Sequence, residues 1–98
     1  MNYISMDADS TLHFPATITF DSVPGYQSFL EKSLESQKIC FDLSGTELIH
    51  SSFAGFLIHA KNIIEKNNRQ LTIKISSGTE KTFRMLEIYN HLRPNIIN

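Results

Sequence analysis

Two adjacent serines, Ser51 and Ser52, stand where the pattern of an apolar helix begins. The first N–H groups of a helix have no partner within the helix, and the helix dipole places about half a positive charge there. A hydroxyl or a phosphate is therefore well stabilised at this position. The pair is typical of either of two roles, which are capping of the helix and acceptance of a phosphoryl group.

Other kinds of chemistry have little support in the residue pattern. The four histidines, at positions 13, 50, 59 and 91, lack the i,i+3 or i,i+4 spacing of metal ligands, and no cysteine pair accompanies them. Gly45 and Gly78 are isolated, which excludes a glycine loop that cradles phosphate. Ser51 lacks the G-x-S-x-G elbow of a serine nucleophile, and a triad with His50 and Asp42 is not expected because adjacent side chains rarely reach the geometry of nucleophile and base. We expect no enzyme activity, no cofactor and no metal.

The serines follow a strand and open a helix. Residues 38–43 form a short apolar run of strand formers, typical of a strand in the middle of a sheet. From residue 51 the period changes to 3.6, and Asn67 and Asn68 favour a stop. The expected buried face of this helix consists of Phe53, Phe56, Leu57, Ala60, Ile63 and Ile64.

The remaining elements complete an alternating pattern. Residues 3–6 and 11–14 read as a hairpin, and residues 17–20 as a strand before a helix capped by Asp21 and Ser22. Residues 71–75 alternate as a half-buried strand, and Ser77 with Glu80 has the spacing of a capping box for a helix to about residue 90. The expected buried face of the first helix is Val23, Tyr26, Phe29, Leu30 and Leu34, and in the last helix the capping box precedes Phe83, Met85 and Leu86. This order predicts one α/β domain over residues 1–98, with a mixed sheet of four to five strands and helices packed against it.

Composition limits the partners. The chain has 98 residues, 41% hydrophobic and 19% charged, with a formal net charge of -1, so it lacks the basic footprint of a nucleic-acid-binding domain. No signal-peptide pattern and no apolar run of membrane-spanning length is present, so we expect a cytoplasmic protein without direct membrane insertion. Cys40, which is the single cysteine, is expected to pack as a small buried hydrophobe.

This arrangement resembles the STAS domain family, which includes the bacterial anti-sigma factor antagonists. In that family an apolar strand ends in Asp-Leu-Ser, and a hydroxyl pair then opens a helix. Residues 42–44 and the pair Ser51-Ser52 fit this pattern. Residues 17–26 resemble the family's second strand entering its first helix, and residues 71–92 its last strand and helix. The resemblance therefore spans nearly the whole chain and implies a single STAS domain.

The resemblance also implies roles for particular residues. The phosphoryl acceptor of the antagonists corresponds to Ser51, and Ser52 matches the next hydroxyl residue. The chain departs from the family at His50, where the family usually has Asp, and at Phe53, where the best-known members have Gly. His50 is either a loop residue with local hydrogen bonds or a partner for a phosphate. Phe53 is either a core residue or an exposed aromatic anchor.

The partner surface is expected around the serines. Asp21 and Ser22, which either cap the first helix or contribute to this surface, border the serine site in the family pattern. Gly45 and Thr46 in the preceding loop are either a turn or part of the same face. The expected partner-binding residues are Asp21, Ser22, Gly45, Thr46, His50, Ser51, Ser52 and Phe53.

Two functions follow from the resemblance. The first is an anti-sigma factor antagonist that binds an anti-sigma factor of the serine-kinase type and is released by phosphorylation of Ser51. The second is an accessory subunit docked on the ATPase of a phospholipid-trafficking ABC transporter, since residues 86–90 look similar to the Tyr-Asn segment of that branch. In the second case the hydroxyl belongs to a constitutive docking surface.

Overall fold

The main sheet has five strands, four of them parallel. The structure is a computed structural model that describes residues 5–6 and 10–97. The strand order is β1-β2-β4-β6-β7, with β1 antiparallel to β2 and all other neighbours parallel. The strands span Ser5–Met6, Thr11–His13, Lys38–Asp42, Gln70–Lys74 and Ile96–Ile97. The predicted α/β class and mixed sheet are confirmed, and the 38–43 segment is the central strand. The hairpin is also present, although its residues 3–4 and 7–9 lie outside the described residues.

A second, two-stranded sheet positions the serines. β3 (Thr17–Ile18) and β5 (Leu48–Ile49) pair in parallel, and the N–H of His50 donates to the Ile18 carbonyl at 2.9 Å. Because the strands are parallel, the residues that follow each of them emerge at the same edge. The segment after Ile18 therefore lies beside the segment that contains Ser51.

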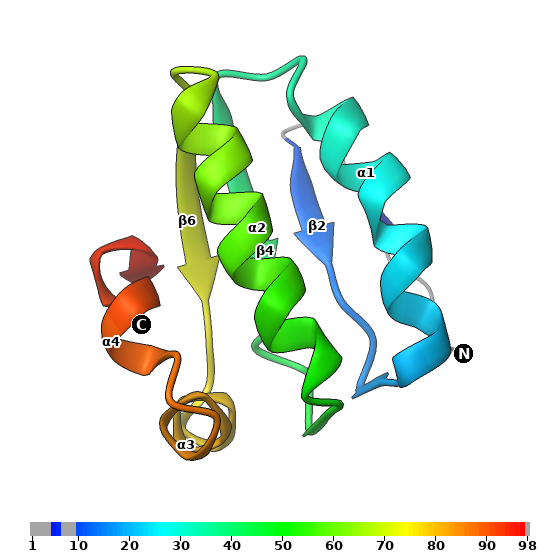
Figure 1. Cartoon of the computed structure of the whole chain (residues 1–98), viewed down its shortest axis with the longest axis vertical. Helices are drawn as coiled ribbons and strands as arrows, with labels where there is room; N and C mark the ends of the chain where they lie inside the picture. The colour runs from blue at the N-terminus through cyan, green and yellow to red at the C-terminus, as the bar shows by residue number, and fades with distance from the viewer. Residues whose placement is uncertain (1–4, 7–9, 98) are drawn as a thin grey trace.

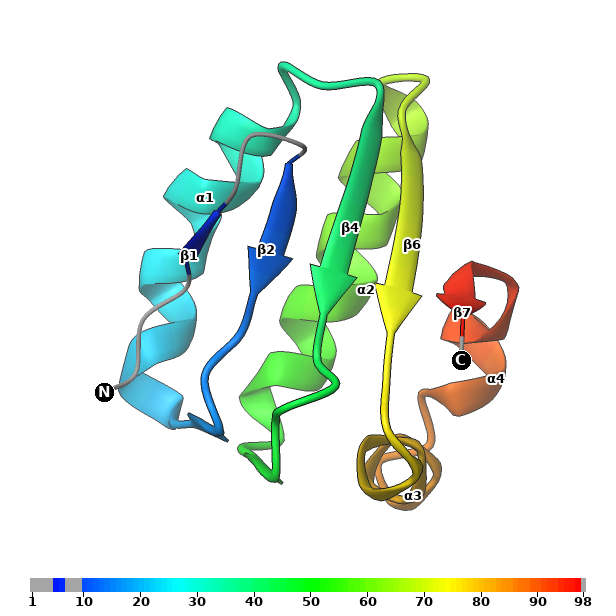
Figure 2. The same ribbon diagram turned by 180° about the vertical axis from the view of Figure 1, so that it is seen from behind.

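The longer helices cover one face of the main sheet (Figure 1). These are α1 (Tyr26–Ser33), preceded by the 3₁₀ helix η1 (Phe20–Gly25), and α2 (Ser52–Lys66). α3 (Ser77–Met85), α4 (Tyr89–Leu92) and the 3₁₀ helix η2 (Arg93–Asn95) follow β6, and Figure 2 shows the opposite face of the sheet without a helix over it. No helix in the described part of the chain is long and apolar enough to cross a membrane.

The open face explains one wrong prediction. Along β4, Ile39 and Phe41 point into the core, so the side chain of Cys40 between them points to the uncovered face. Cys40 is half-buried and lines a shallow pocket of about 270 Å³ with Lys38 and Thr72. The expectation that Cys40 is a buried hydrophobe was wrong, because helices cover only one face of β4 and Cys40 lies on the other.

An aromatic cluster joins the sheet to α1 and α2. Phe14 packs edge-on against Tyr26, Phe41 and Phe53 at centroid distances of 5.4, 5.4 and 5.2 Å, and Phe53 stacks on Phe56 at 5.6 Å. The Tyr26 hydroxyl is buried without a hydrogen-bond partner among the described residues. Burial raises the pKa of Tyr26 and outweighs the opposite effect of the nearby Ser22 hydroxyl, which is itself bonded to Thr19. The cluster fixes the beginning of α2 against the sheet.

The helix ends differ from the predicted ones. Thr19, not Asp21, precedes the first helix, and the Ser22 hydroxyl accepts the Thr19 N–H at 3.2 Å, so the predicted cap was placed too late. The last helix is capped by Ser76, whose hydroxyl accepts the Thr79 N–H at 3.2 Å, so the predicted Ser77 capping box was also displaced.

The last helical segment is also divided in two. α3 ends at Met85, and Glu87 has a left-handed backbone with φ of 61°, so the single helix predicted to about residue 90 was wrong. α4 follows as a separate short helix. Met85, at the end of α3, is 78% exposed.

A buried asparagine holds the C-terminal segment in place. Asn95 donates to the Leu71 carbonyl at 3.0 Å and to Glu65 Oε2 at 3.2 Å, and it accepts a bond from Lys61 Nζ at 2.5 Å. These contacts connect η2 to α2 and β6 and allow β7 to pair with β6. Sequence analysis did not predict β7, because two isoleucines are too few to show a strand period.

We expect Asn95→Ala to destabilise the fold by about 1–3 kcal/mol, since it removes the buried hydrogen-bond partners of Leu71 and Lys61. Urea denaturation measures this loss. Asn90→Ala, at an exposed position of α4, is the matched control and should stay within about 0.5 kcal/mol of the native chain. Equal stability of the two variants would show that the Asn95 contacts do not hold the segment.

Candidate functional site

Ser51 lies between β5 and α2 with its side chain exposed. The residue has φ of -58° and ψ of -26° and occupies the N-cap position, yet its hydroxyl caps nothing. The hydroxyl has no hydrogen-bond partner among the described residues. The capping interpretation of Ser51 was therefore wrong, and the hydroxyl is accessible at the positive end of a helix of 15 residues.

His50 performs the capping instead. The N–H of Ser52 donates to His50 Nδ1 at 3.0 Å, and the Ser52 hydroxyl lies 2.9 Å from the same nitrogen. Nδ1 must be unprotonated to accept the backbone N–H. The imidazole thus satisfies one of the free N–H groups at the start of α2, which agrees with the predicted alternative of local hydrogen bonds for His50.

Two exposed apolar side chains lie beside Ser51. The ring of Phe20 packs edge-on against the ring of His50 with centroids 5.3 Å apart, and 65% of Phe20 is exposed. Leu48 on β5, three residues before Ser51, is also 65% exposed. Because β3 and β5 pair, the segments that carry these two side chains lie side by side, and exposed apolar groups that gather in one region mark interaction surfaces more often than scattered ones do. We call Phe20 and Leu48 the apolar pair.

The loop between β4 and β5 is held from both ends. Asp42 Oδ1 accepts bonds from the Ser44 hydroxyl at 2.6 Å and the Ser44 N–H at 2.9 Å. At the other end the Thr46 hydroxyl donates to the Pro15 carbonyl at 2.9 Å, and Thr79 Oγ1 lies 3.3 Å from the Thr46 carbonyl. Gly45 is exposed between these anchors, so this loop is a fixed turn next to the serines.

The anchor at Asp42 predicts a dependence of stability on pH. Burial alone would raise the pKa of the Asp42 carboxyl, but the two bonds from Ser44, together with His13 Nδ1 at 3.1 Å, hold the pKa below its ordinary value of 3.8. The group therefore contributes stability above pH 3.8, which is lost as the pH falls from that value through the lower pKa of the folded state. Urea midpoints measured across this acid range should fall less steeply for Asp42→Asn than for the native chain. The same slope for both would contradict this role of Asp42.

Two of the expected partner contacts are buried. Phe53 is 0% exposed at the centre of the aromatic cluster, and Thr46 is 3% exposed and engaged by Pro15 and Thr79. The assignment of their side chains to the partner surface was wrong. Phe53 packs in the core at the start of α2, and Thr46 anchors the loop between β4 and β5. Asp21, Gly45 and Ser51 are exposed.

The residues of the site differ in how available they are. Ser22 is half-buried and its hydroxyl is bonded to Thr19, whereas Asp21 has no ion-pair partner among the described residues. Ser52 is half-buried and bonded to His50. The structure thus brings together the exposed Ser51, the capping His50 and the adjacent Phe20, while Ser22 and Ser52 serve local structure.

Gly55 on α2 has open surroundings. It is exposed, and a Cβ added there would meet no atom within 4 Å. We therefore expect Gly55→Ala to stabilise the fold by about 0.5–1 kcal/mol, because alanine loses less backbone entropy inside a helix. Thermal denaturation measures this gain. A lower melting temperature would contradict the open surroundings of Gly55.

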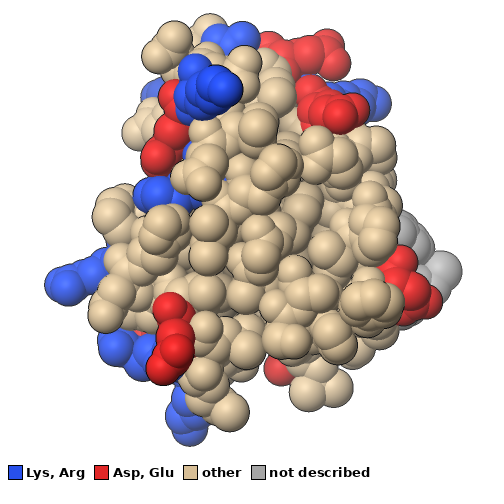
Figure 3. Space-filling model, viewed as in Figure 1, with Lys and Arg blue, Asp and Glu red and all other residues tan. Residues whose placement is uncertain are grey.

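Sequence reasoning missed the apolar pair, although a charge signal pointed to this region. Residues 1–31 and 39–60 contain no Lys or Arg. In Figure 3 the Lys and Arg side chains gather along the top and left edges, and the middle of the face is uncharged. Phe20 and Leu48 both lie in the segments without basic residues.

Comparisons with known proteins identify no relative. No model of a known protein family matches the chain, and a search of curated proteins gives no match. Within the described residues no three His, Cys, Asp or Glu side chains are grouped so that they could hold a metal ion. The function is therefore argued from the geometry around Ser51 and from the sequence pattern.

Proposed function

We propose that this chain is a cytoplasmic STAS-type interaction domain that acts as an anti-sigma factor antagonist. In its unphosphorylated form it binds an anti-sigma factor of the serine-kinase type, and phosphorylation of Ser51 ends this binding. The observation that carries the proposal is the Ser51 hydroxyl, which is exposed and unbonded among the described residues at the start of α2.

The surroundings of Ser51 fit a docking surface. The apolar pair offers the kind of exposed side chains that a partner buries, and the aromatic Phe20 is held in place by the ring of His50. The aromatic cluster beneath fixes α2, so the hydroxyl is presented on a rigid element. Among the described residues no base lies in hydrogen-bond contact with the hydroxyl, which suits acceptance of a phosphoryl group from a kinase better than catalysis by the chain itself.

Charge explains how phosphorylation switches binding. A phosphate adds about -1.5 to -2 charges, which the positive end of α2 tolerates without refolding. A partner that covers Ser51 must then remove water from the phosphate. The exposed Asp21 and Glu47 nearby are acidic, so neither side chain compensates the charge of the phosphate. The modified surface is therefore stable in water and unfavourable in the complex.

The test uses a serine-kinase anti-sigma factor encoded in the same genome. The purified chain is titrated with this partner by calorimetry, first without ATP and then after incubation with Mg-ATP. We expect a complex that becomes at least about 100-fold weaker after phosphorylation. The absence of a complex in the first titration would contradict the proposed function.

A second candidate function has its own supporting observation. The Arg84 guanidinium lies 3.9 Å from the centroid of the Tyr89 ring, and these residues line a pocket of about 300 Å³ with Glu87 and Asn90. This is the segment that resembles the accessory subunits of phospholipid-trafficking ABC transporters. A partner ATPase would then dock without a phosphorylation switch at Ser51. Such a subunit would not need the family's Asp at position 50, and His50 would serve only to cap α2.

Neighbouring genes separate these two candidates. A sigma factor or a serine kinase beside the gene supports the antagonist, whereas permease and ATPase subunits support the transporter subunit. In binding experiments Tyr89→Ala should weaken the complex with an ATPase subunit and leave a complex with an anti-sigma factor unchanged. Tyr89 is half-buried, so circular dichroism of the variant controls for folding.

A further inference from the structure

Three of the four large hydrophobic side chains that are exposed among the described residues belong to one end of the molecule. Phe20, Leu48 and Met85 are 65%, 65% and 78% exposed. They lie at the start of η1, on β5 and on α3, and these segments are all at the lower end in Figure 1. The contact between Thr79 on α3 and Thr46 in the loop shows that these segments adjoin.

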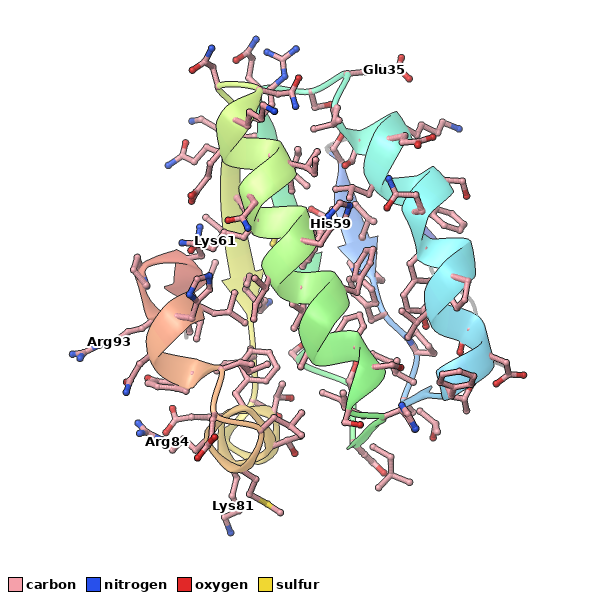
Figure 4. The ribbon with its side chains drawn as sticks, viewed as in Figure 1. Glu35, His59, Lys61, Lys81, Arg84 and Arg93 are labelled. Atoms are coloured by element: carbon pink, nitrogen blue, oxygen red, sulfur yellow. The ribbon has the colours of Figure 1, made fainter. Side chains whose placement is uncertain are left out.

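Charged side chains of opposite sign divide this end into two halves. Asp21 and Glu47 are exposed next to Phe20 and Leu48, and Lys81 on α3 is one helical turn before Met85. Figure 4 shows Lys81 pointing away from the body of the molecule at the lower end. None of the three charged side chains has an ion-pair partner among the described residues. We call the set Phe20, Asp21, Glu47, Leu48, Lys81 and Met85 the basal surface.

We propose that the basal surface joins two copies of this chain in a two-fold symmetric dimer. A two-fold axis between the halves places the acidic half of one copy against the basic half of the other, twice in the same interface. Glu47 then faces the Lys81 side chain of the second copy, and Leu48 faces its Met85. The arrangement pairs Glu47 with Lys81 twice and covers the exposed apolar side chains of both copies.

The charge pattern selects a second copy as the occupant. Residues 1–31 and 39–60 contain six acidic and no basic residues, whereas residues 61–98 contain seven basic and three acidic ones. A partner of one sign would match only one half of the basal surface and repel the other. A second copy supplies both positive and negative side chains in the required order. Ser51 lies beside the same surface, so the dimer competes with any partner that docks at Ser51.

The dimer is tested by sedimentation velocity over a series of protein concentrations, at low and at high salt. We expect Glu47→Lys and Lys81→Glu each to weaken dimerisation at least about tenfold, because each places like charges opposite one another. The double variant exchanges the two signs and should return to within about threefold of the native dissociation constant. Lys66→Glu, exposed at the end of α2, is the control and should change nothing.

A native chain that stays monomeric over the whole concentration series would overturn the proposal. A dimer that single charge reversals do not weaken, or that the double variant does not restore, would overturn it too. Met85→Ser, which leaves all charges in place, should also weaken the dimer, and an unchanged dissociation constant would contradict the proposed interface. These measurements need no partner and no phosphorylation, so their result is independent of the proposed function.

Discussion

Ser51→Glu is expected to abolish binding of the anti-sigma partner while leaving the fold intact. The substitution places a fixed carboxylate on the residue that the structure exposes at the start of α2. The helix dipole favours a negative charge there by about 0.3–1 kcal/mol, so thermal stability should stay equal or rise slightly. A partner that covers the site must desolvate the carboxylate, and calorimetry should show a loss of about 100-fold or more in affinity.

Two matched variants show whether the loss of binding requires the added charge and whether it requires the position of Ser51. Ser51→Ala removes the hydroxyl without adding charge and should bind as tightly as the native chain while resisting phosphorylation. Asn62→Glu adds the same charge at an exposed position of α2 almost three turns away and should leave binding unchanged. Equal affinity of Ser51→Glu and Asn62→Glu would show that Ser51 does not lie in the interface.

The largest effect on stability is expected for Phe53→Ala, at about 3–5 kcal/mol. Phe53 is completely buried, and its ring contacts Phe14, Tyr26 and Phe56 at centroid distances of 5.2, 5.9 and 5.6 Å. Removing the ring leaves a cavity at the point where α2 meets the sheet. Since domains of this size are stable by only about 5–15 kcal/mol, the urea midpoint should fall by a large fraction of its native value.

Phe20→Ala provides the comparison on the surface. Its ring is 65% exposed and contacts His50, so stability should change by less than about 0.5 kcal/mol while partner binding weakens. Comparison of the two variants therefore separates the contribution of core packing to stability from the contribution of the surface to partner binding. A Phe53→Ala variant as stable as Phe20→Ala would contradict the burial of Phe53.

The apolar periodicity of the sequence was sufficient to predict α2 and the central strand β4. Each has a regularly spaced set of buried apolar residues, which loops lack. The two asparagines at residues 67 and 68 end α2 where expected. The caps were less predictable, because several hydroxyl residues stand at neighbouring positions and any of them satisfies the pattern. Ser76 rather than Ser77, and Thr19 rather than Asp21, were selected by the tertiary contacts around them.

The site was predicted in position but not in detail. The sequence located Ser51 at the start of α2, but it did not show that His50 takes over the capping and leaves the Ser51 hydroxyl unbonded. It did not reveal Phe20 as a surface residue either, because Phe20 was placed in the strand predicted over residues 17–20, whereas β3 ends at Ile18 and Phe20 begins η1. That contact depends on the parallel pairing of β3 and β5, which are only two residues long each and show no period of their own.

The most direct test of the switch is mass spectrometry of the chain isolated from its native cells under several growth conditions. We predict a phosphate on Ser51 in the peptide that contains Ser51 and Ser52, at a level that changes with growth conditions. Fragmentation between the two serines assigns the site. An unmodified peptide under every condition, or phosphate confined to Ser52, would contradict the proposal that Ser51 is the switch.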